Sequence, residues 1–137
     1  MKLITRDTDY AIRAICFMAK KRYRVVSVSE LVKELKIPKP FLRKILQILN
    51  RSNVLKSYKG SGGGFILNRP ADKIFILDII TANQGPFGLF GHTFKDKACR
   101  QASKCPLKKK LDVIESNIRK DLKSITIADL ICGKGFK

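Results

Sequence analysis

SVSELVKEL (residues 27–35), KIPK (36–39) and PFLRKILQILNR (40–51) follow one another in the chain, and these three segments decide the fold. Ser27 and Glu30 have the spacing of a capping box. In such a box the serine hydroxyl accepts a hydrogen bond from the Glu30 amide, and the Glu30 side chain accepts one from the Ser27 amide. A helix is therefore predicted to begin near Val28. Pro38 ends it, because a proline disfavours helical geometry in the preceding residue, and a second helix begins at Pro40.

The second predicted helix has one apolar face and one polar face. Its apolar face carries Phe41, Leu42, Ile45, Leu46 and Leu49. Two short amphipathic helices joined by a turn of about four residues form a helix-turn-helix, whose second helix can enter the major groove of DNA. On the polar face, Arg43 is suited to reading guanine and Gln47 to reading adenine.

A glycine-rich hairpin is predicted directly after these helices. Residues 54–59 and 65–67 are strand-like runs on either side of Gly60-Ser61-Gly62-Gly63-Gly64. Glycines allow such a tip to approach a phosphate backbone closely. The expected fold class is therefore mainly α with a small β-hairpin wing (α+β), built as a winged helix-turn-helix domain.

The rest of the chain is also predicted to be mostly helical. Periodicity indicates a first helix over residues 5–20, in which Asp9 can pair with Arg13. A short strand is expected at residues 74–76, before a helix that ends at Gly85. Residues 106–124 predict a long helix with a continuous apolar face, and the Thr126 side chain is expected to cap a last short helix.

The charge of the chain favours a polyanionic partner. Twenty-nine basic and eleven acidic residues give +18, and no acidic residue occurs between Glu34 and Asp72, where the predicted reading unit lies. Neutralising phosphates releases counterions and favours binding to nucleic acid. Two alternatives stay open on charge alone: a general basic nucleic-acid-binding protein, or a chain whose surface is simply rich in lysine.

Several other classes of protein are not expected. No apolar run approaches the roughly 20 residues that span a bilayer, and the N-terminus turns polar too soon for a signal peptide, so the expected location is the cytoplasm, without membrane contact. Four scattered cysteines do not form a secreted disulfide framework. One histidine, no nucleophile–base constellation and no P-loop argue against an enzyme.

Four stretches together resemble the Rrf2 family of bacterial transcription regulators. They are TDYAIR (residues 8–13), the hairpin segment at residues 51–67, LDII (77–80) and SITIADL (124–130). The resemblance covers nearly the whole chain and implies a homodimer in which the long helix crosses its twin. It also implies a division into a DNA-binding domain at residues 1–84, a sensory cysteine loop at 85–106 and a dimerisation region at 107–137.

The resemblance and the residue pattern indicate the same DNA contacts. Arg43 and Gln47 are expected to read bases, and Lys39 and Arg51 to hold phosphates. The hairpin wing, with Lys59 and its glycine-rich tip, is expected to enter or straddle the minor groove. A two-fold dimer predicts a pseudopalindromic operator. The expected DNA-binding residues are Ser29, Lys39, Pro40, Arg43, Lys44, Gln47, Arg51, Lys59, Ser61, Gly62 and Gly63.

Cys99 and Cys105 mark the candidate sensory site, where the iron–sulfur branch of the family carries its ligands. That branch typically has a third cysteine, and Thr93 stands at its position here. A 2Fe-2S cluster held by four protein ligands would need further groups, for which His92 and Asp9 are candidates, the latter across the dimer. Without a cluster, Cys99 and Cys105 could form a reversible disulfide.

Two further kinds of control are compatible with the same sequence. A metabolite could act as the signal, or a regulatory protein partner could bind the chain. The apolar loop from Phe87 to Phe94 is a candidate docking site for such a partner.

Overall fold

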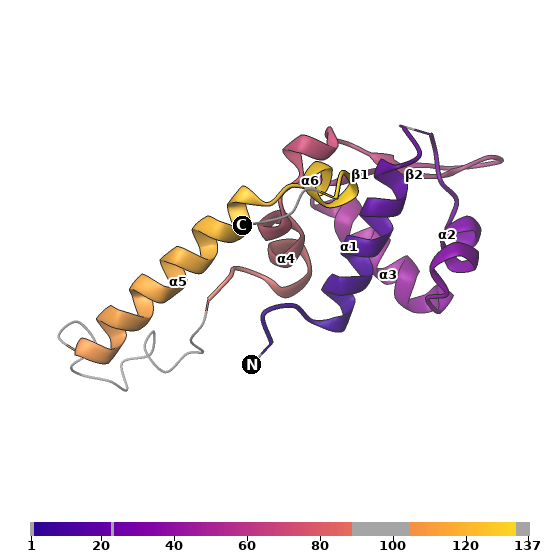
Figure 1. The fold of residues 1–137 in the computed structure, drawn as a ribbon. Helices are drawn as coiled ribbons and strands as arrows, with labels where there is room; N and C mark the ends of the chain where they lie inside the picture. The colour runs from indigo at the N-terminus through magenta and orange to yellow at the C-terminus, as the bar shows by residue number, and fades with distance from the viewer. Residues whose placement is uncertain (1, 23, 89–104, 134–137) are drawn as a thin grey trace.

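The computed structural model describes residues 2–22, 24–88 and 105–133. Its elements are α1 (Arg6–Ala19), α2 (Val28–Leu35), α3 (Lys39–Arg51), β1 (Leu55–Tyr58), β2 (Gly64–Leu67), the 3-10 helix η1 (Ala71–Lys73), α4 (Ile76–Gln84), α5 (Pro106–Ser124) and α6 (Ile127–Ile131). Figure 1 shows a head made of α1 to α4 with the hairpin and α6, from which α5 projects as an arm. The mainly α fold with a small β-hairpin is confirmed.

α1 forms the centre of the head. The Thr5 side chain caps it by accepting from the Thr8 amide, and Ala11, Ala14 and Ile15 are fully buried on one side. The predicted pair of Asp9 and Arg13 is present at 3.0 Å.

Gln84, at the end of α4, ties the start of the chain to the head. The Thr8 hydroxyl donates to Gln84 Oε1 over 2.6 Å, the Thr5 amide donates to the same oxygen over 3.1 Å, and Gln84 Nε2 donates to the Leu3 carbonyl over 3.3 Å. Thr8 is fully buried, so this bond satisfies a hydroxyl that would otherwise be costly to bury.

α2 begins at Val28 as predicted, but only half of the capping box forms. The Glu30 amide donates to the Ser27 hydroxyl over 3.1 Å. The Glu30 carboxylate instead accepts two hydrogen bonds from the Arg24 guanidinium, at 2.6 and 3.2 Å, because an arginine fork is a stronger donor than one amide. Lys36 ends α2 in a left-handed conformation, with φ of 55°.

α3 begins one residue earlier than predicted, and one of its apolar residues lies outside the core. Leu42, Ile45, Leu46 and Leu49 are buried as expected. Phe41 was expected with them but is 43% exposed, because it lies beside the start of α1, where the Arg6 guanidinium covers its ring at 5.5 Å.

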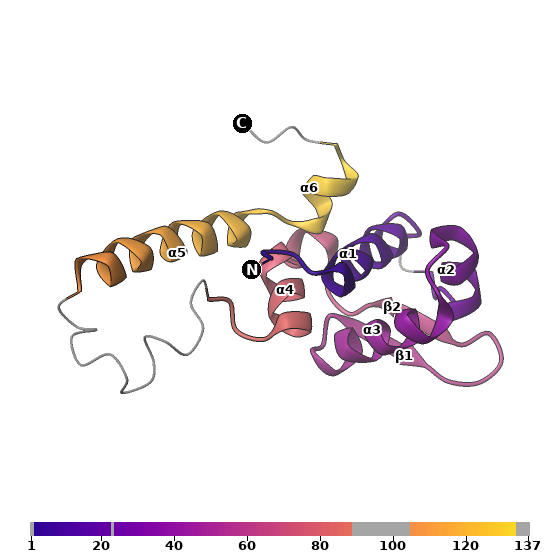
Figure 2. The ribbon, with the colours of Figure 1, turned by 90° about the horizontal axis from the view of Figure 1, so that it is seen from below.

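The hairpin is antiparallel, with Leu55 opposite Leu67 and Tyr58 opposite Gly64. Val26 forms a further bridge with Phe65, which joins the chain ahead of α2 to the edge of β2. Figure 2 shows the hairpin extending from the head on the same side as α2 and α3. The wing is therefore fixed to the chain that leads into the helix-turn-helix.

No strand forms at residues 74–76, so that prediction is wrong. η1 precedes this stretch, Phe75 makes a single bridge with Thr126, and Ile76 already begins α4. The Asp78 carboxylate accepts from the Phe75 amide over 3.1 Å, and this local cap favours a helix start over a longer pairing. The predicted helix end at Gly85 is confirmed.

α5 has the predicted bounds but packs differently from the head helices. Among its residues only Leu122 is buried, while Leu107 and Val113 are 59% and 53% exposed. The chain then returns to the head, where Thr126 and Asp129 form the predicted capping box of α6. No helix among the described residues has the length and apolar character needed to cross a membrane.

Candidate DNA-binding surface

A groove of about 500 Å³ lies between α3, the start of α2 and the hairpin. Several predicted DNA-binding residues line it, which brings together parts of the chain that are far apart in sequence. The lining residues are Ser27, Val28, Ser29, Lys39, Arg43, Gln47, Asn50, Ser57, Tyr58, Lys59, Gly60, Gly63, Gly64 and Phe65.

The α3 side of the groove is one stripe of that helix. Lys39, Arg43, Gln47 and Asn50 follow one another at spacings of four, four and three residues, which places them on one face. The opposite face is the buried row that includes Leu42 and packs into the head. Packing of the apolar face therefore fixes which polar side chains face the groove.

Lys44 and Arg51 are exposed but do not line the groove. The Lys44 ammonium lies 3.9 Å from the Asp7 carboxylate, at the start of α1. Lys44 was expected among the DNA-binding residues. In the structure it lies on the side of α3 that faces the start of α1, not on the side that lines the groove. Pro40, at the exposed start of α3, also lies outside the groove lining.

The start of α2 closes one end of the groove with Ser29, which is exposed. Beside it, the hydrogen bonds from Arg24 lower the pKa of the Glu30 carboxyl, and the same bonds raise the pKa of the Arg24 guanidinium. Both groups therefore stay charged near neutral pH. Their pairing fixes the chain just ahead of α2 against the first turn of that helix.

Glycines in the hairpin tip serve two different purposes. Gly60 and Gly62 have φ of 94° and 75°, a left-handed conformation that side chains disfavour, and open space surrounds them. Gly63 and Gly64 are packed: a Cβ on Gly63 would collide with the Tyr58 carbonyl, and one on Gly64 with the Val26 carbonyl. Ser61 and Gly62 are exposed at the tip, beyond the groove lining.

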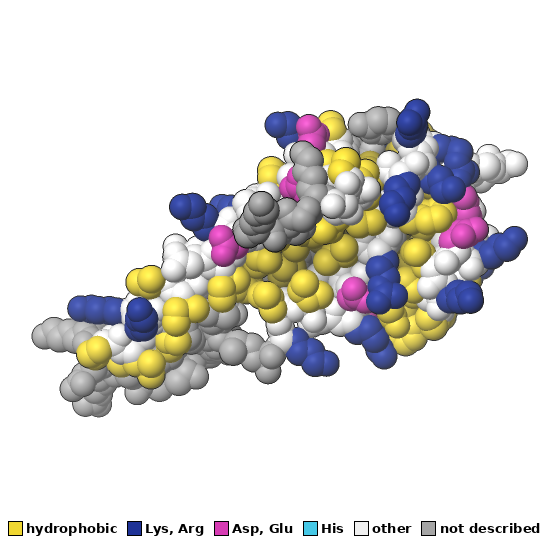
Figure 3. Space-filling view, viewed as in Figure 1, with side chains coloured by type: hydrophobic (Ala, Val, Ile, Leu, Met, Phe, Trp, Pro, Cys, Tyr) yellow, Lys and Arg dark blue, Asp and Glu magenta, His cyan; other side chains and the backbone are white. Residues whose placement is uncertain are grey.

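Sequence reasoning missed some groove residues. Asn50 could have been found, because it lies three residues after Gln47 on the same helical face. Ser57 and Tyr58 depend on the twist and register of the hairpin, which the sequence does not specify. Figure 3 shows Lys and Arg side chains gathered at the end of the head that carries α2 and the hairpin. Lys39, Arg43 and Lys59 supply the cations that line the groove itself.

The candidate sensory residues are only partly described. Cys105 is half-buried at the residue that precedes α5, whereas Cys99 and His92 lie outside the described residues. Asp9 is on α1 and already pairs with Arg13. Figures 1 and 2 show α1 and the start of α5 at well-separated places. Asp9 and Cys105 of one chain therefore do not lie close enough to bind the same cluster.

Within the described part of the chain, no group of three or more His, Cys, Asp and Glu residues could hold a metal ion. The described donors of one chain therefore do not by themselves fit a four-ligand cluster. Cys16 packs against the core, and burial raises the pKa of its thiol, with the Lys20 charge acting in the opposite direction. Its thiol is thus the less reactive, protonated form at neutral pH.

Phe87 is the described part of the apolar loop after α4. It packs against the core, and Arg119 of α5 donates to its carbonyl over 2.7 Å while the guanidinium lies 6.0 Å from its ring. This contact joins the start of the loop to the arm. The remaining phenylalanines of the predicted docking loop lie outside the described residues.

Comparison with known proteins identifies relatives over the full length. A family model described as Rrf2, iron-dependent transcriptional regulator, matches residues 4–133. A protein of Aquifex aeolicus (strain VF5) named "Putative HTH-type transcriptional regulator" is 37% identical over 139 residues, covering 94% of this chain and 92% of that protein.

Two solved structures share the fold. CymR, the global cysteine regulator of B. subtilis, has a TM-score of 0.77 and 21% identity, with 98% of this chain and 100% of that chain covered. IscR of T. potens has a TM-score of 0.73 and 22% identity, with 98% of this chain and 89% of that chain covered. The family match spans nearly all of the sequence, and the chain therefore belongs to the Rrf2 family of transcriptional regulators.

Proposed function

We propose that this Rrf2-type regulator binds a specific, pseudopalindromic operator as a homodimer. The single observation that carries the proposal is the groove in which Lys39, Arg43 and Gln47 of α3 face Lys59 of the wing. A helix that presents an arginine and an amide side chain on one exposed face is suited to the major groove. The glycine-tipped wing alongside is suited to the adjacent minor groove.

The proposed roles follow from where each side chain lies. Arg43 reads guanine and Gln47 reads adenine, while Lys39, at the start of α3, holds a phosphate. Lys59 and the tip from Ser61 to Gly63 follow the minor groove. Arg51 and Lys44 lie outside the groove and contribute only through charge to flanking phosphates.

The arm supports the dimer part of the proposal. Leu107, Leu111, Ile114 and Ile118 repeat at spacings of three and four along α5, and none of them is buried within one chain. An apolar stripe of this kind is stabilised by a second copy of the same helix. Figure 3 shows hydrophobic side chains exposed along α5 and over the adjoining surface of the head.

We further propose that the redox or iron–sulfur state of Cys99 and Cys105 controls DNA affinity. The family description supports iron as a signal, and the two cysteines themselves support thiol chemistry. Cys105 immediately precedes α5, so a bond made by its sulfur acts at the start of the dimer helix. With two cysteines as ligands, a four-ligand cluster would take the other two from His92 and the partner subunit's Asp9.

Sequence specificity is the test of the DNA-binding proposal. A random duplex library is selected with the purified protein, and the enriched duplex is challenged with excess bulk DNA at one salt concentration. The proposal predicts a symmetric enriched sequence whose complex survives the challenge. Complete displacement of the protein from the enriched duplex by bulk DNA would instead indicate a general basic nucleic-acid-binding protein.

Purification without oxygen tests the control proposal. Visible absorption bands that disappear in Cys99→Ser would identify a cluster, whereas colourless protein whose operator affinity changes on thiol oxidation would identify a disulfide switch. Equal operator affinity of the wild type and the Cys99→Ala/Cys105→Ala variant under every redox and iron condition would refute both.

A further inference from the structure

The hairpin carries a cation that lies outside the groove, next to an aromatic ring that lines it. Leu55 is buried and Ser57 is half-buried, and the alternation of a strand places the exposed Lys56 and Tyr58 together on the other face of β1. The Lys56 ammonium lies 5.4 Å from the centroid of the Tyr58 ring. The Tyr58 side chain is 45% exposed.

The register of the hairpin leaves this pair open. Tyr58 is opposite Gly64, which has no side chain to cover the ring, and Lys56 is opposite Ile66. Lys56 makes no ion pair with any of the described residues, and no acidic residue occurs between Glu34 and Asp72 in the sequence. The ammonium is therefore held in place by an aromatic ring rather than neutralised by a carboxylate.

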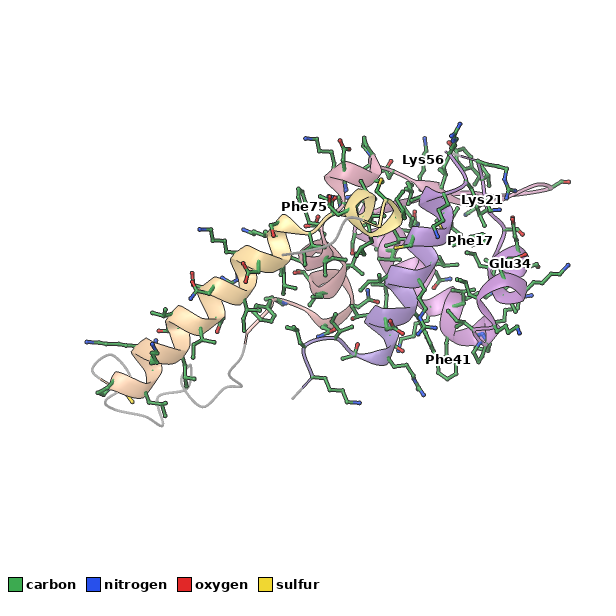
Figure 4. All side chains as sticks on the ribbon, viewed as in Figure 1. Phe17, Lys21, Glu34, Phe41, Lys56 and Phe75 are labelled. Atoms are coloured by element: carbon green, nitrogen blue, oxygen red, sulfur yellow. The ribbon has the colours of Figure 1, made fainter. Side chains whose placement is uncertain are left out.

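The pair extends the groove outward along the hairpin. Tyr58 lines the groove together with residues of α3, whereas Lys56 does not line it. Figure 4 shows Lys56 and Phe41, at the start of α3, at opposite edges of the head. If α3 reads a half-site and the wing follows the next minor groove, the outer face of the hairpin is directed toward the sugar–phosphate wall outside that half-site.

We propose that Lys56 and Tyr58 form a phosphate contact to DNA that flanks each half-site. The Lys56 ammonium pairs with a phosphate oxygen, and the Tyr58 hydroxyl donates to the same backbone while its ring orients the lysine. A phosphate contact does not depend on the base sequence, so it adds affinity without changing the preferred operator. The inference rests on the proposed DNA-binding function and extends the contact surface beyond the groove.

The test compares two probes that contain the selected operator: one with eight-base-pair flanks of random sequence and one trimmed at the outermost selected base pair. Wild type should bind the flanked probe about tenfold more tightly than the trimmed probe. Lys56→Gln should lose most of this difference, so that its affinity for the flanked probe falls close to the wild-type affinity for the trimmed probe. Its log–log salt slope on the flanked probe should fall by about 2 per dimer, one phosphate per chain.

Controls separate a DNA contact from a structural role. Lys56→Arg should restore flank-dependent binding, and Tyr58→Phe, which keeps the ring, should lose only part of it. Lys110→Gln on the arm removes an equal charge and should leave the flank effect unchanged. If Lys56→Gln lost affinity equally for both probes, or if its salt slope were unchanged, the inference would be overturned. Failure of the wild type to enrich any operator would instead overturn the proposed function itself.

Discussion

The head and the arm bury their apolar residues to very different extents. In the head, α1, α3 and α4 each contribute four or more buried side chains to one core, whereas the 19-residue α5 contributes only Leu122. The head therefore has the internal packing needed to fold, and the arm has an apolar face that one chain does not use. Substitutions in the two regions should consequently separate folding from assembly.

The largest expected effect comes from the arm. Ile114→Asp places a charge in the proposed dimer face, and linking two heads is worth about 100-fold or more in operator affinity. We expect a monomer by light scattering, a comparable loss of operator affinity and an unchanged head fold by circular dichroism. Ser116→Asp, beside Arg119 and Lys120 on a polar side of α5, introduces the same charge and should remain dimeric.

A core substitution in the head should affect folding instead. Leu46 is fully buried, so Leu46→Ala should lower the free energy of unfolding by about 2–5 kcal/mol through lost burial and the cavity that remains. Leu130→Ala, at an exposed position of α6, should cost about 1 kcal/mol or less. Denaturant unfolding at one protein concentration measures both, and equal losses would contradict the distinction between core and surface.

A smaller effect is expected at the reading face. Arg43→Ala should cost about 1–3 kcal/mol of operator affinity per half-site and relax the preference at one base pair. Lys44→Ala, the neighbouring residue outside the groove, should weaken binding to all sequences alike. Selection profiles of the two variants check this, and an unchanged base preference in Arg43→Ala would remove that residue from base reading.

The smallest effect concerns the pair next to α2. Hydrogen bonds from Arg24 lower the pKa of the Glu30 carboxyl from its ordinary 4.5, so the pair stabilises the fold above that pH and its contribution is lost as the pH falls through the folded-state value. Glu30→Gln should therefore flatten the decline of Tm below about pH 4.5, an effect kept small by solvent exposure. An unchanged decline of Tm in Glu30→Gln would contradict a stabilising role for this pair.

Local signals in the sequence predicted most of the fold. Ser27, Pro38 and the glycines of the hairpin act on their own neighbours, and α5 has the predicted bounds. The strand at residues 74–76 failed for a local reason, the cap that Asp78 provides to Phe75. Two other predictions failed where a residue outside the local pattern supplied a partner. Arg24 bound the Glu30 carboxylate, and Arg6 covered Phe41 at the edge of α3.

The candidate DNA-binding surface was predictable in part for the same reason. Helical spacing placed Arg43 and Gln47 on one face, and it could have added Asn50. That spacing could not predict where a side chain lies relative to the other helices and the hairpin. Lys44 faces Asp7 rather than the groove, and the outward Lys56 and Tyr58 pair depends on the register of the hairpin.

The mass of the protein–operator complex in solution tests most directly whether the arm pairs two reading heads. The account predicts two chains on each selected operator, bound cooperatively, with half-sites separated by about one helical turn or a multiple of it. It also predicts that Ile114→Asp binds the same duplex as single, weakly held chains. One chain per operator, with an affinity that the arm substitution does not change, would contradict it.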